Sequence, residues 1–319
     1  MADASTVSMI CAMDKITGTY SDAPLFDNVD SYITTISANN DSADIYFPKP
    51  TLLNSHTDAY SFPIALLLQG VNVDKSNYSK FATLVASYGF IVVVPNHERS
   101  VPELNLTGLF PETSQIEAVQ AQMKAENSNP ASPIAGIVNT QKLALLGHSW
   151  GGAVGLSALA NLCLPILCDG GYSRPNEVVA GVIFGASLRH PTTQEFISIN
   201  NSGIPIALLQ GNIDSIALFE RAEKTYNNIQ TPPKILINVS GVNHYGITNT
   251  NNPNGAAPDN NTPTLDQNVA VETVARWSGL FLRASVLNDK DAIDYIYSQG
   301  DELDENVSAQ SQLPELSTE

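Results

Sequence analysis

The chain has 319 residues, 43% of them hydrophobic, which is enough for one large domain with a substantial core. Its formal net charge of −17 argues against a nucleic-acid partner, because phosphate binding needs a basic face. No apolar run approaches the roughly 18 residues of a membrane span, so we expect no transmembrane segment. No signal peptide is visible at the N-terminus, which favours the cytoplasm and otherwise leaves the location open.

Along the chain, apolar runs of strand length alternate with helical patterns. An antiparallel pair of strands is expected first, at residues 31–36 and 44–47. The strands expected after it are residues 64–68, 91–94, 143–146, 178–184, 205–210 and 234–239. The expected helices are residues 77–88, 114–124, 217–229 and 270–281. This alternation predicts an α/β fold, in which a mainly parallel sheet carries helices on both faces.

We expect residues 1–300 to form a single domain. The last residues, 301–319, are acidic and rich in Ser and Gln, so they are predicted to form a mobile tail. A long Asn/Pro/Gly-rich stretch at residues 249–264 is predicted to be a loop beside the functional site, either a lid or a disordered connection.

One motif predicts the chemistry. The run Gly147-His148-Ser149-Trp150-Gly151 has the form G-x-S-x-G and lies between an apolar strand and a run of small apolar residues. Strand, tight turn and helix make a nucleophile elbow, in which a strained serine exposes its hydroxyl above the sheet. A Cβ on the flanking glycines would collide with neighbouring segments. Ser149 is therefore the predicted nucleophile, and the alternative is a structural turn.

A serine hydroxyl needs a base, and in such sites the acid and then the histidine follow the serine along the chain. His244 follows the strand at residues 234–239, at the sheet edge where catalytic groups gather. Asp214 follows the preceding strand at the same edge. We predict His244 as the base and Asp214 as the acid. The alternatives are a loop histidine and a helix-capping aspartate.

The oxyanion of such a reaction needs two fixed N–H donors. We predict the backbone N–H groups of Trp150 and Val71, with Asn72 as second choice to Val71. The Trp150 indole is expected either to wall the pocket or to pack. No metal or organic cofactor is implied, and the three cysteines fit no zinc spacing. Cys163 and Cys168 are close enough for a disulfide, with two buried thiols as the alternative.

Over roughly residues 30–285, these motifs resemble the α/β-hydrolase superfamily, and within it the group of chlorophyllases, dienelactone hydrolases and polyester hydrolases. The segments similar to chlorophyllases are residues 66–70, 77–79 and 86–95, the Gly-His-Ser-x-Gly-Gly elbow, and Gly241-Val242-Asn243-His244. Gln69 departs from the pattern, since chlorophyllases carry His there. The strand after the elbow helix ends in Gly185-Ala186-Ser187, without their usual acid. Asp214 lies one strand later, as in polyester and dienelactone hydrolases.

The resemblance implies an α/β-hydrolase fold and a serine carboxylic-ester hydrolase that works through an acyl-enzyme. The implied partner is a small-molecule or pigment ester of hydrophobic character, and a chlorophyllase-like enzyme would convert chlorophyll to chlorophyllide and phytol. The alternative is a general carboxylesterase or a cutinase-like polyester hydrolase. A catalytically inactive binding protein on the same fold is the alternative from another class, and the Ser–Asp–His order argues against it. The sequence leaves the oligomeric state open.

Overall fold

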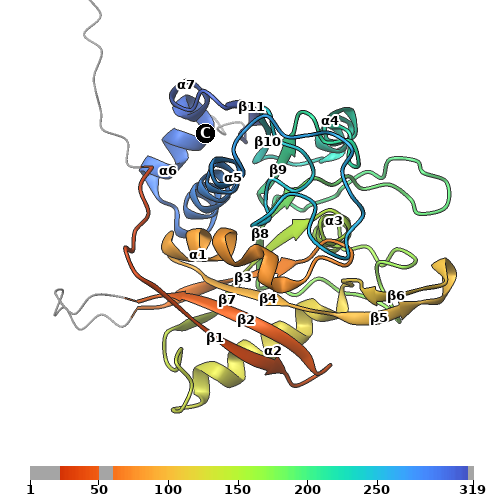
Figure 1. Ribbon diagram of the computed structural model, residues 1–319. Coiled ribbons are helices and arrows are strands. Elements are labelled where there is room, and N and C mark those ends of the chain that lie inside the picture. The colour runs from red at the N-terminus through yellow and green to blue at the C-terminus, as the bar shows by residue number, and fades with distance from the viewer. Residues whose placement is uncertain (1–21, 50–59, 315–319) are drawn as a thin grey trace, which may run out of the picture.

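The computed structural model describes residues 22–49 and 60–314. A nine-stranded sheet runs through its centre in the order β1-β2-β4-β3-β7-β8-β9-β10-β11 (Figure 1). The strands from β4 to β10 in this order are parallel, while β1, β2 and β11 pair antiparallel with their neighbours. The strands are β1 (Val29–Ile36), β2 (Asp41–Pro48), β3 (Phe62–Leu68), β4 (Ile91–Pro95), β7 (Val138–His148), β8 (Val178–Phe184), β9 (Ile206–Gly211), β10 (Lys234–Val239) and β11 (Val307–Gln312).

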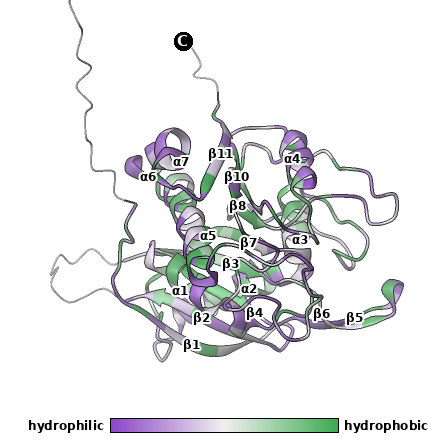
Figure 2. Cartoon of the chain, turned by 45° about the horizontal axis from the view of Figure 1, so that its top comes forward, coloured by the Kyte–Doolittle hydropathy of each residue, from purple (hydrophilic) through white to green (hydrophobic). Residues whose placement is uncertain are grey.

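Helices cover both faces of the sheet because successive side chains of each central strand point to opposite faces. Along β3, Ala65 and Leu67 pack in one core with α1 and α5, whereas Leu66 and Leu68 pack in the other with α2 and α3. The central strands are hydrophobic and the outer surfaces of α4, α6 and α7 are hydrophilic (Figure 2). The helices are α1 (Ser79–Ser87), α2 (Ser114–Ser128), α3 (Trp150–Leu159), α4 (Phe219–Asn228), α5 (Gln267–Leu282), α6 (Lys290–Asp294) and α7 (Gly300–Leu303).

The predicted alternation is confirmed, and so is the antiparallel pair of strands near the N-terminus. Two of the predicted strands, at residues 178–184 and 234–239, coincide with β8 and β10. Among the described residues, no helix combines the length and the apolar character needed to cross a membrane.

Two segments differ from the sequence prediction. A hairpin of β5 (Glu98–Val101) and β6 (Leu106–Leu109) was not expected, because most of its residues are polar or exposed. The chain turns before β6 at Asn105, which has a positive φ of 52°. The predicted tail is wrong for residues 307–312, which form β11 and pair along the whole of β10. Backbone pairing with β10 holds this largely polar edge strand in place, and Val307 adds one buried side chain to the core.

A disulfide joins Cys163 to Cys168, so the structure decides between the two alternatives for this pair. The bridge closes a short loop after α3. The carbonyl of Ile166 in this loop accepts a hydrogen bond from Arg99, which attaches the loop to the β5–β6 hairpin.

Candidate active site

Ser149 lies at the turn between β7 and α3 with a strained backbone, φ 55° and ψ −119°. The turn is tight enough to exclude side chains from its neighbours. A Cβ on Gly147 would lie 2.7 Å from the Gly151 carbonyl oxygen, and one on Gly151 would overlap the Leu68 carbonyl. The predicted elbow geometry is therefore present, and Ser149 is half-buried at the carboxyl edge of the sheet.

The structure brings Asp214 and His244 together. Asp214 Oδ2 lies 2.7 Å from His244 Nδ1, and both residues are almost fully buried. The other oxygen of Asp214 accepts the backbone N–H groups of Ile216 and Ala217 at 2.8 and 2.7 Å. Because a carboxylate can only accept, Nδ1 of His244 carries the proton of this bond and Nε2 is left as an acceptor.

Ser149 and His244 line the same cavity, which measures about 240 Å³. The hydrogen bonds among the described residues do not include one between the Ser149 hydroxyl and His244. Such bonds are often long in enzymes without substrate and shorten when substrate binds. Val71, Trp150 and Ala257 also line this cavity, and Ala257 belongs to the long loop at residues 249–264.

That loop contributes a carboxylate that sequence reasoning missed. Asp259, 5% exposed, accepts the backbone N–H of His244 at 2.9 Å and the hydroxyl of Ser215 at 2.6 Å. Burial raises the pKa of Asp259, but these hydrogen bonds outweigh it and the pKa is lowered. Asp259 thus joins the segment that carries Asp214 to the segment that carries His244. No local pattern distinguishes it from any other loop aspartate.

A second missed residue is Tyr78, which ends the 3₁₀ helix Lys75–Tyr78. Its hydroxyl accepts the Gly70 N–H at 2.8 Å and lies 2.9 Å from His148 Nδ1. His148 Nε2 lies 3.0 Å from the His244 carbonyl oxygen. Since a carbonyl can only accept, Nε2 is protonated, and Nδ1 accepts from Tyr78. Burial, then the nearby His244, lower the pKa of His148, which keeps this ring neutral.

The two residues predicted as oxyanion donors lie at the cavity beside Ser149. The N–H of Asn72, the second choice, is not free to donate to an oxyanion, because it donates to the Leu109 carbonyl at 3.0 Å. The Asn72 side-chain oxygen accepts the Leu109 N–H, also at 3.0 Å. The Trp150 indole packs against a neighbouring aromatic ring and also lines the cavity. It meets Phe110 edge to face, and its Nε1 donates to the Pro111 carbonyl at 3.2 Å.

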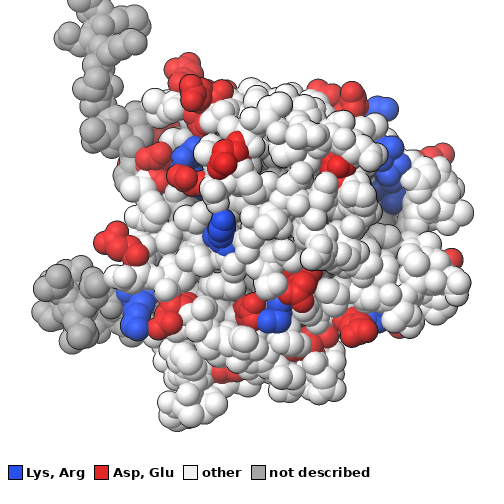
Figure 3. Space-filling model, in the orientation of Figure 1, with Lys and Arg blue, Asp and Glu red and all other residues white. Residues whose placement is uncertain are grey.

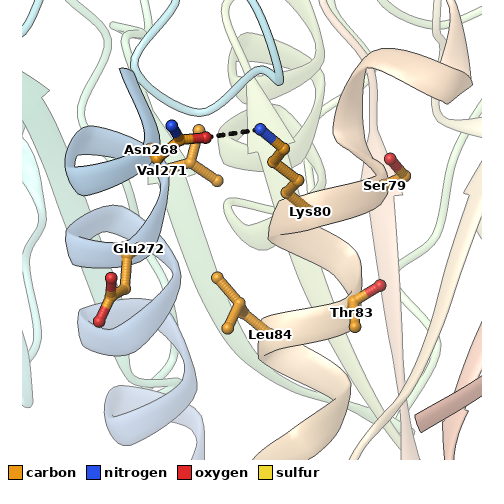
Figure 4. Close-up of a pocket in the computed structure, with 7 residues that line it drawn as sticks. All are labelled: Ser79, Lys80, Thr83, Leu84, Asn268, Val271 and Glu272. Carbon is orange, nitrogen blue, oxygen red and sulfur yellow. Dashed lines mark hydrogen bonds between the residues drawn. The ribbon is translucent and has the colours of Figure 1, made fainter. Parts of the chain in front are cut away.

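A larger cavity of about 410 Å³ lies between α1 and α5, away from this site. Lys80 Nζ there donates to Asn268 Oδ1 at 2.6 Å (Figure 4). Its serine, Ser79, accepts a hydrogen bond from Asn249, and no histidine lines the cavity. Nor do the described residues include a group of three or more His, Cys, Asp or Glu side chains able to hold a metal ion. The groups needed for nucleophilic chemistry therefore gather at Ser149.

The end of β8 lies beside the same histidine but carries no carboxylate. Gly185 has φ 60°, and a Cβ added to it would lie 3.2 Å from His244 Nδ1 and 3.4 Å from Asp214 Oδ2. Gly185 is thus positioned beside the histidine but contributes no side chain. The carboxylate reaches the same nitrogen from the neighbouring strand.

The parallel sheet, the elbow and the placement of Asp214 and His244 define an α/β-hydrolase fold. The sequence profile of the family described as Chlorophyllase matches residues 22–164. That region includes the elbow and stops before Asp214 and His244. Within the α/β-hydrolases, the chain therefore resembles the chlorophyllases.

Curated relatives agree with this likeness. The chain is 30% identical over 105 residues to "Chlorophyllase-1, chloroplastic" of Citrus unshiu, covering 33% of this chain and 31% of the relative. It is 30% identical over 115 residues to "Chlorophyllase type 0" of Chenopodium album, covering 33% and 30%. For "Chlorophyllase-1" of Arabidopsis thaliana, the identity is 30% over 123 residues, covering 36% and 35%. The matched region thus spans about a third of each relative.

Proposed function

We propose that this protein is a serine carboxylic-ester hydrolase, with Ser149 as nucleophile, His244 as general base and Asp214 as the acid that orients it. The observation that carries the proposal is the 2.7 Å contact between Asp214 and His244, beside a strained elbow serine in the same cavity. The likeness to chlorophyllases independently supports ester hydrolysis at the level of the family.

In the proposed reaction, the Ser149 hydroxyl attacks the ester carbonyl while His244 Nε2 takes its proton. Asp214 holds the imidazole in the required tautomer and stabilises its cation. His244 then protonates the departing alcohol, which leaves an acyl group on Ser149. Water attacks this acyl-enzyme with His244 again as base, and the acid is released.

The oxyanion formed in both steps needs donors that are already in place. The N–H of Trp150, at the first position of α3, has no acceptor within its own helix. Val71 follows Gly70, whose own N–H donates to Tyr78, so this loop is held firmly beside the elbow. We assign the Trp150 and Val71 N–H groups to the oxyanion.

The cavity beside Ser149 supports an ester of moderate size. Its volume of about 240 Å³ is just below the range of small-molecule sites, which span roughly 300–1,000 Å³. A flat macrocycle or a long isoprenoid alcohol would have to extend beyond it. This volume favours a general carboxylesterase over a chlorophyllase, while the family likeness favours the chlorophyllase.

Both the proposed ester hydrolysis and the size of the substrate can be tested by measuring the turnover of three esters side by side. The three are a p-nitrophenyl ester, a polyester film and detergent-solubilised chlorophyll. We expect wild-type protein to hydrolyse at least one of them and to react with a fluorophosphonate probe. Ser149→Ala should lose labelling and at least about 10⁴-fold in kcat. Retention of a tenth of the activity by Ser149→Ala would refute the nucleophile. A wild-type protein that neither labels nor turns over any ester would instead be a binding protein on this fold.

A further inference from the structure

Trp150 lines two cavities. One is the cavity beside Ser149, and the other, of about 270 Å³, does not include the serine. Because Trp150 directly follows Ser149, any ester bound at the serine passes close to this ring. The second cavity is therefore within reach of a substrate whose carbonyl lies at Ser149.

The walls of the second cavity are largely apolar. Ile166 and Leu167 come from the loop closed by the disulfide, Ala153 from α3, and Leu104 from the β5–β6 hairpin. Leu104 is 41% exposed, and the hairpin tip stands out as a hydrophobic point on the surface (Figure 2). An aliphatic chain would cover these side chains and remove them from water.

One charged residue, Arg189, lines the cavity. Among the described residues, most Lys and Arg side chains form hydrogen bonds or ion pairs with other described residues. The exceptions are Arg189, Arg221, Lys224 and Lys290. Burial, then the charge of Arg221, lower the pKa of Arg189.

The first three of these residues form a basic cluster next to the second cavity. Lys224 lies over the ring of Phe196, 5.5 Å from its centroid, and Phe196 bridges to Arg189 through the backbone. Arg221 is on the same helix as Lys224, three residues earlier. Basic side chains gather beside α4 and the loop after β8, on a protein with a net charge of −17 (Figure 3).

The carboxylates nearest in sequence are those of Glu195, Glu220 and Glu223. All three are exposed, and none forms an ion pair within 4.0 Å with a described residue. Cations held close together without a partner repel one another, and a bound anion would relieve that repulsion. The fork of an arginine matches the two oxygens of a carboxylate.

We propose that the cavity between Trp150 and Arg189 is a second substrate subsite, which holds an aliphatic chain ending in a carboxylate. The inference rests on the proposed function and names its substrate class, an ester that carries a free carboxylate at the end of an apolar chain. The apolar walls hold the chain and Arg189 binds the anion.

The test compares esters that differ only in the terminal group. One pair is the mono-p-nitrophenyl ester of adipic acid and the same ester with a primary amide in place of the carboxylate. A second pair places the same terminal groups on the alcohol side, as acetates of 6-hydroxyhexanoic acid and its amide. We expect kcat/KM to favour the carboxylate by about five- to tenfold in at least one pair, and the preference to shrink with added salt.

Arg189→Gln should reduce this ratio to about one. The ratio is measured on one protein sample at a time, so a loss of active protein cancels. Lys290→Gln is the matched control, because it removes the same charge from an exposed position on α6 and should keep the ratio. A ratio of one or less in both wild-type pairs, or an equal loss in both variants, would overturn the subsite.

A binding measurement separates this inference from the proposed function. Calorimetry with monomethyl adipate and the Ser149→Ala variant needs no turnover. Binding that weakens about five- to tenfold in Ser149→Ala/Arg189→Gln would support the subsite even if no ester were hydrolysed. Binding that is the same with and without Arg189 would contradict it even if ester hydrolysis were established.

Discussion

The Tyr78 hydroxyl and His148 Nδ1 lie 2.9 Å apart in the protein interior. Through this pair, the loop that carries Val71 is connected to the elbow and, by His148 Nε2, to the backbone of His244. The three segments come from distant parts of the chain. The pair therefore acts as a positioning element that sets the distances between the proposed oxyanion donor, nucleophile and base.

Tyr78→Phe should lower kcat by about 10- to 100-fold with little change in KM, because small displacements of reacting groups are costly. The substitution also leaves the buried Gly70 N–H and His148 Nδ1 without a partner, at about 1–3 kcal/mol each. Tyr88→Phe is the matched control, since Tyr88 is also buried and donates to the Asp22 carbonyl. If both variants lose stability but neither loses kcat, the pair is purely structural.

Asp214→Asn should lower kcat by roughly 10²–10⁴-fold, since an amide favours the wrong tautomer of His244 and cannot stabilise its cation. Thermal unfolding should show that most of the protein is still folded. Glu195→Gln tests an exposed carboxylate between β8 and β9 and should leave kcat unchanged. A greater loss in Glu195→Gln than in Asp214→Asn would mean that the acid is misassigned.

Asp259→Asn should weaken the connection between the two segments that carry Asp214 and His244. An amide nitrogen would face one of the donors that the carboxylate now accepts, so we expect a loss of about 1–3 kcal/mol in the free energy of unfolding and about tenfold in kcat. Asp266→Asn is the control, because Asp266 caps α5 and accepts two backbone N–H groups there. Urea unfolding and steady-state kinetics of both variants make the comparison. If the two variants have equal kcat values, Asp259 does not help to position His244.

Stability should fall as the pH rises from about 6.5 to 9. Burial lowers the pKa of His97, but the carboxylates of Asp41 and Glu112 outweigh it and raise the pKa to about 9. The unfolded value is about 6.5, so the contribution is complete below that pH and lost as the pH passes through 9. Its size is up to roughly 3 kcal/mol.

Urea unfolding at pH 6, 7.5 and 9 measures this contribution as the difference between wild type and His97→Asn. The difference should be largest at pH 6 and smallest at pH 9. His190→Asn is the control, because His190 forms no ion pair with a carboxylate of the described residues. A constant difference between wild type and His97→Asn would show that the pKa of His97 is the same in the folded and unfolded states.

Much of the fold could be predicted because the central strands are buried on both faces and read as continuous apolar runs, as in β8 and β10. The positions of Asp214 and His244 were predictable for a related reason, since parallel strands end at one edge of the sheet. The polar strand β11 gave no such signal, because its pairing with β10 depends on backbone groups that every sequence carries.

Tyr78 illustrates a second kind of feature that could not be predicted from the sequence. Because Tyr78 lies on one helical face with Phe81 and Val85, the sequence predicts an ordinary core residue. Its ring does lie in the core. Its hydroxyl contacts His148, 70 residues away along the chain, and no local pattern encodes that pairing. Hydrogen bonds between distant segments emerge only once the sheet has brought the segments together.

Gly185 lies where a neighbouring strand could supply the carboxylate beside His244. Its backbone faces the same imidazole nitrogen that Asp214 contacts, so two adjacent strands offer the carboxylate alternative origins. The left-handed conformation at Gly185, φ 60°, is one that aspartate tolerates better than most residues. Because a Cβ at position 185 would crowd both the imidazole and the Asp214 carboxylate, an acid on β8 and one on β9 are alternatives for the same place beside the histidine. The strand that bears the acid would then distinguish lineages within this fold, whereas the proposed substrate preference would depend on the two cavities that Trp150 lines.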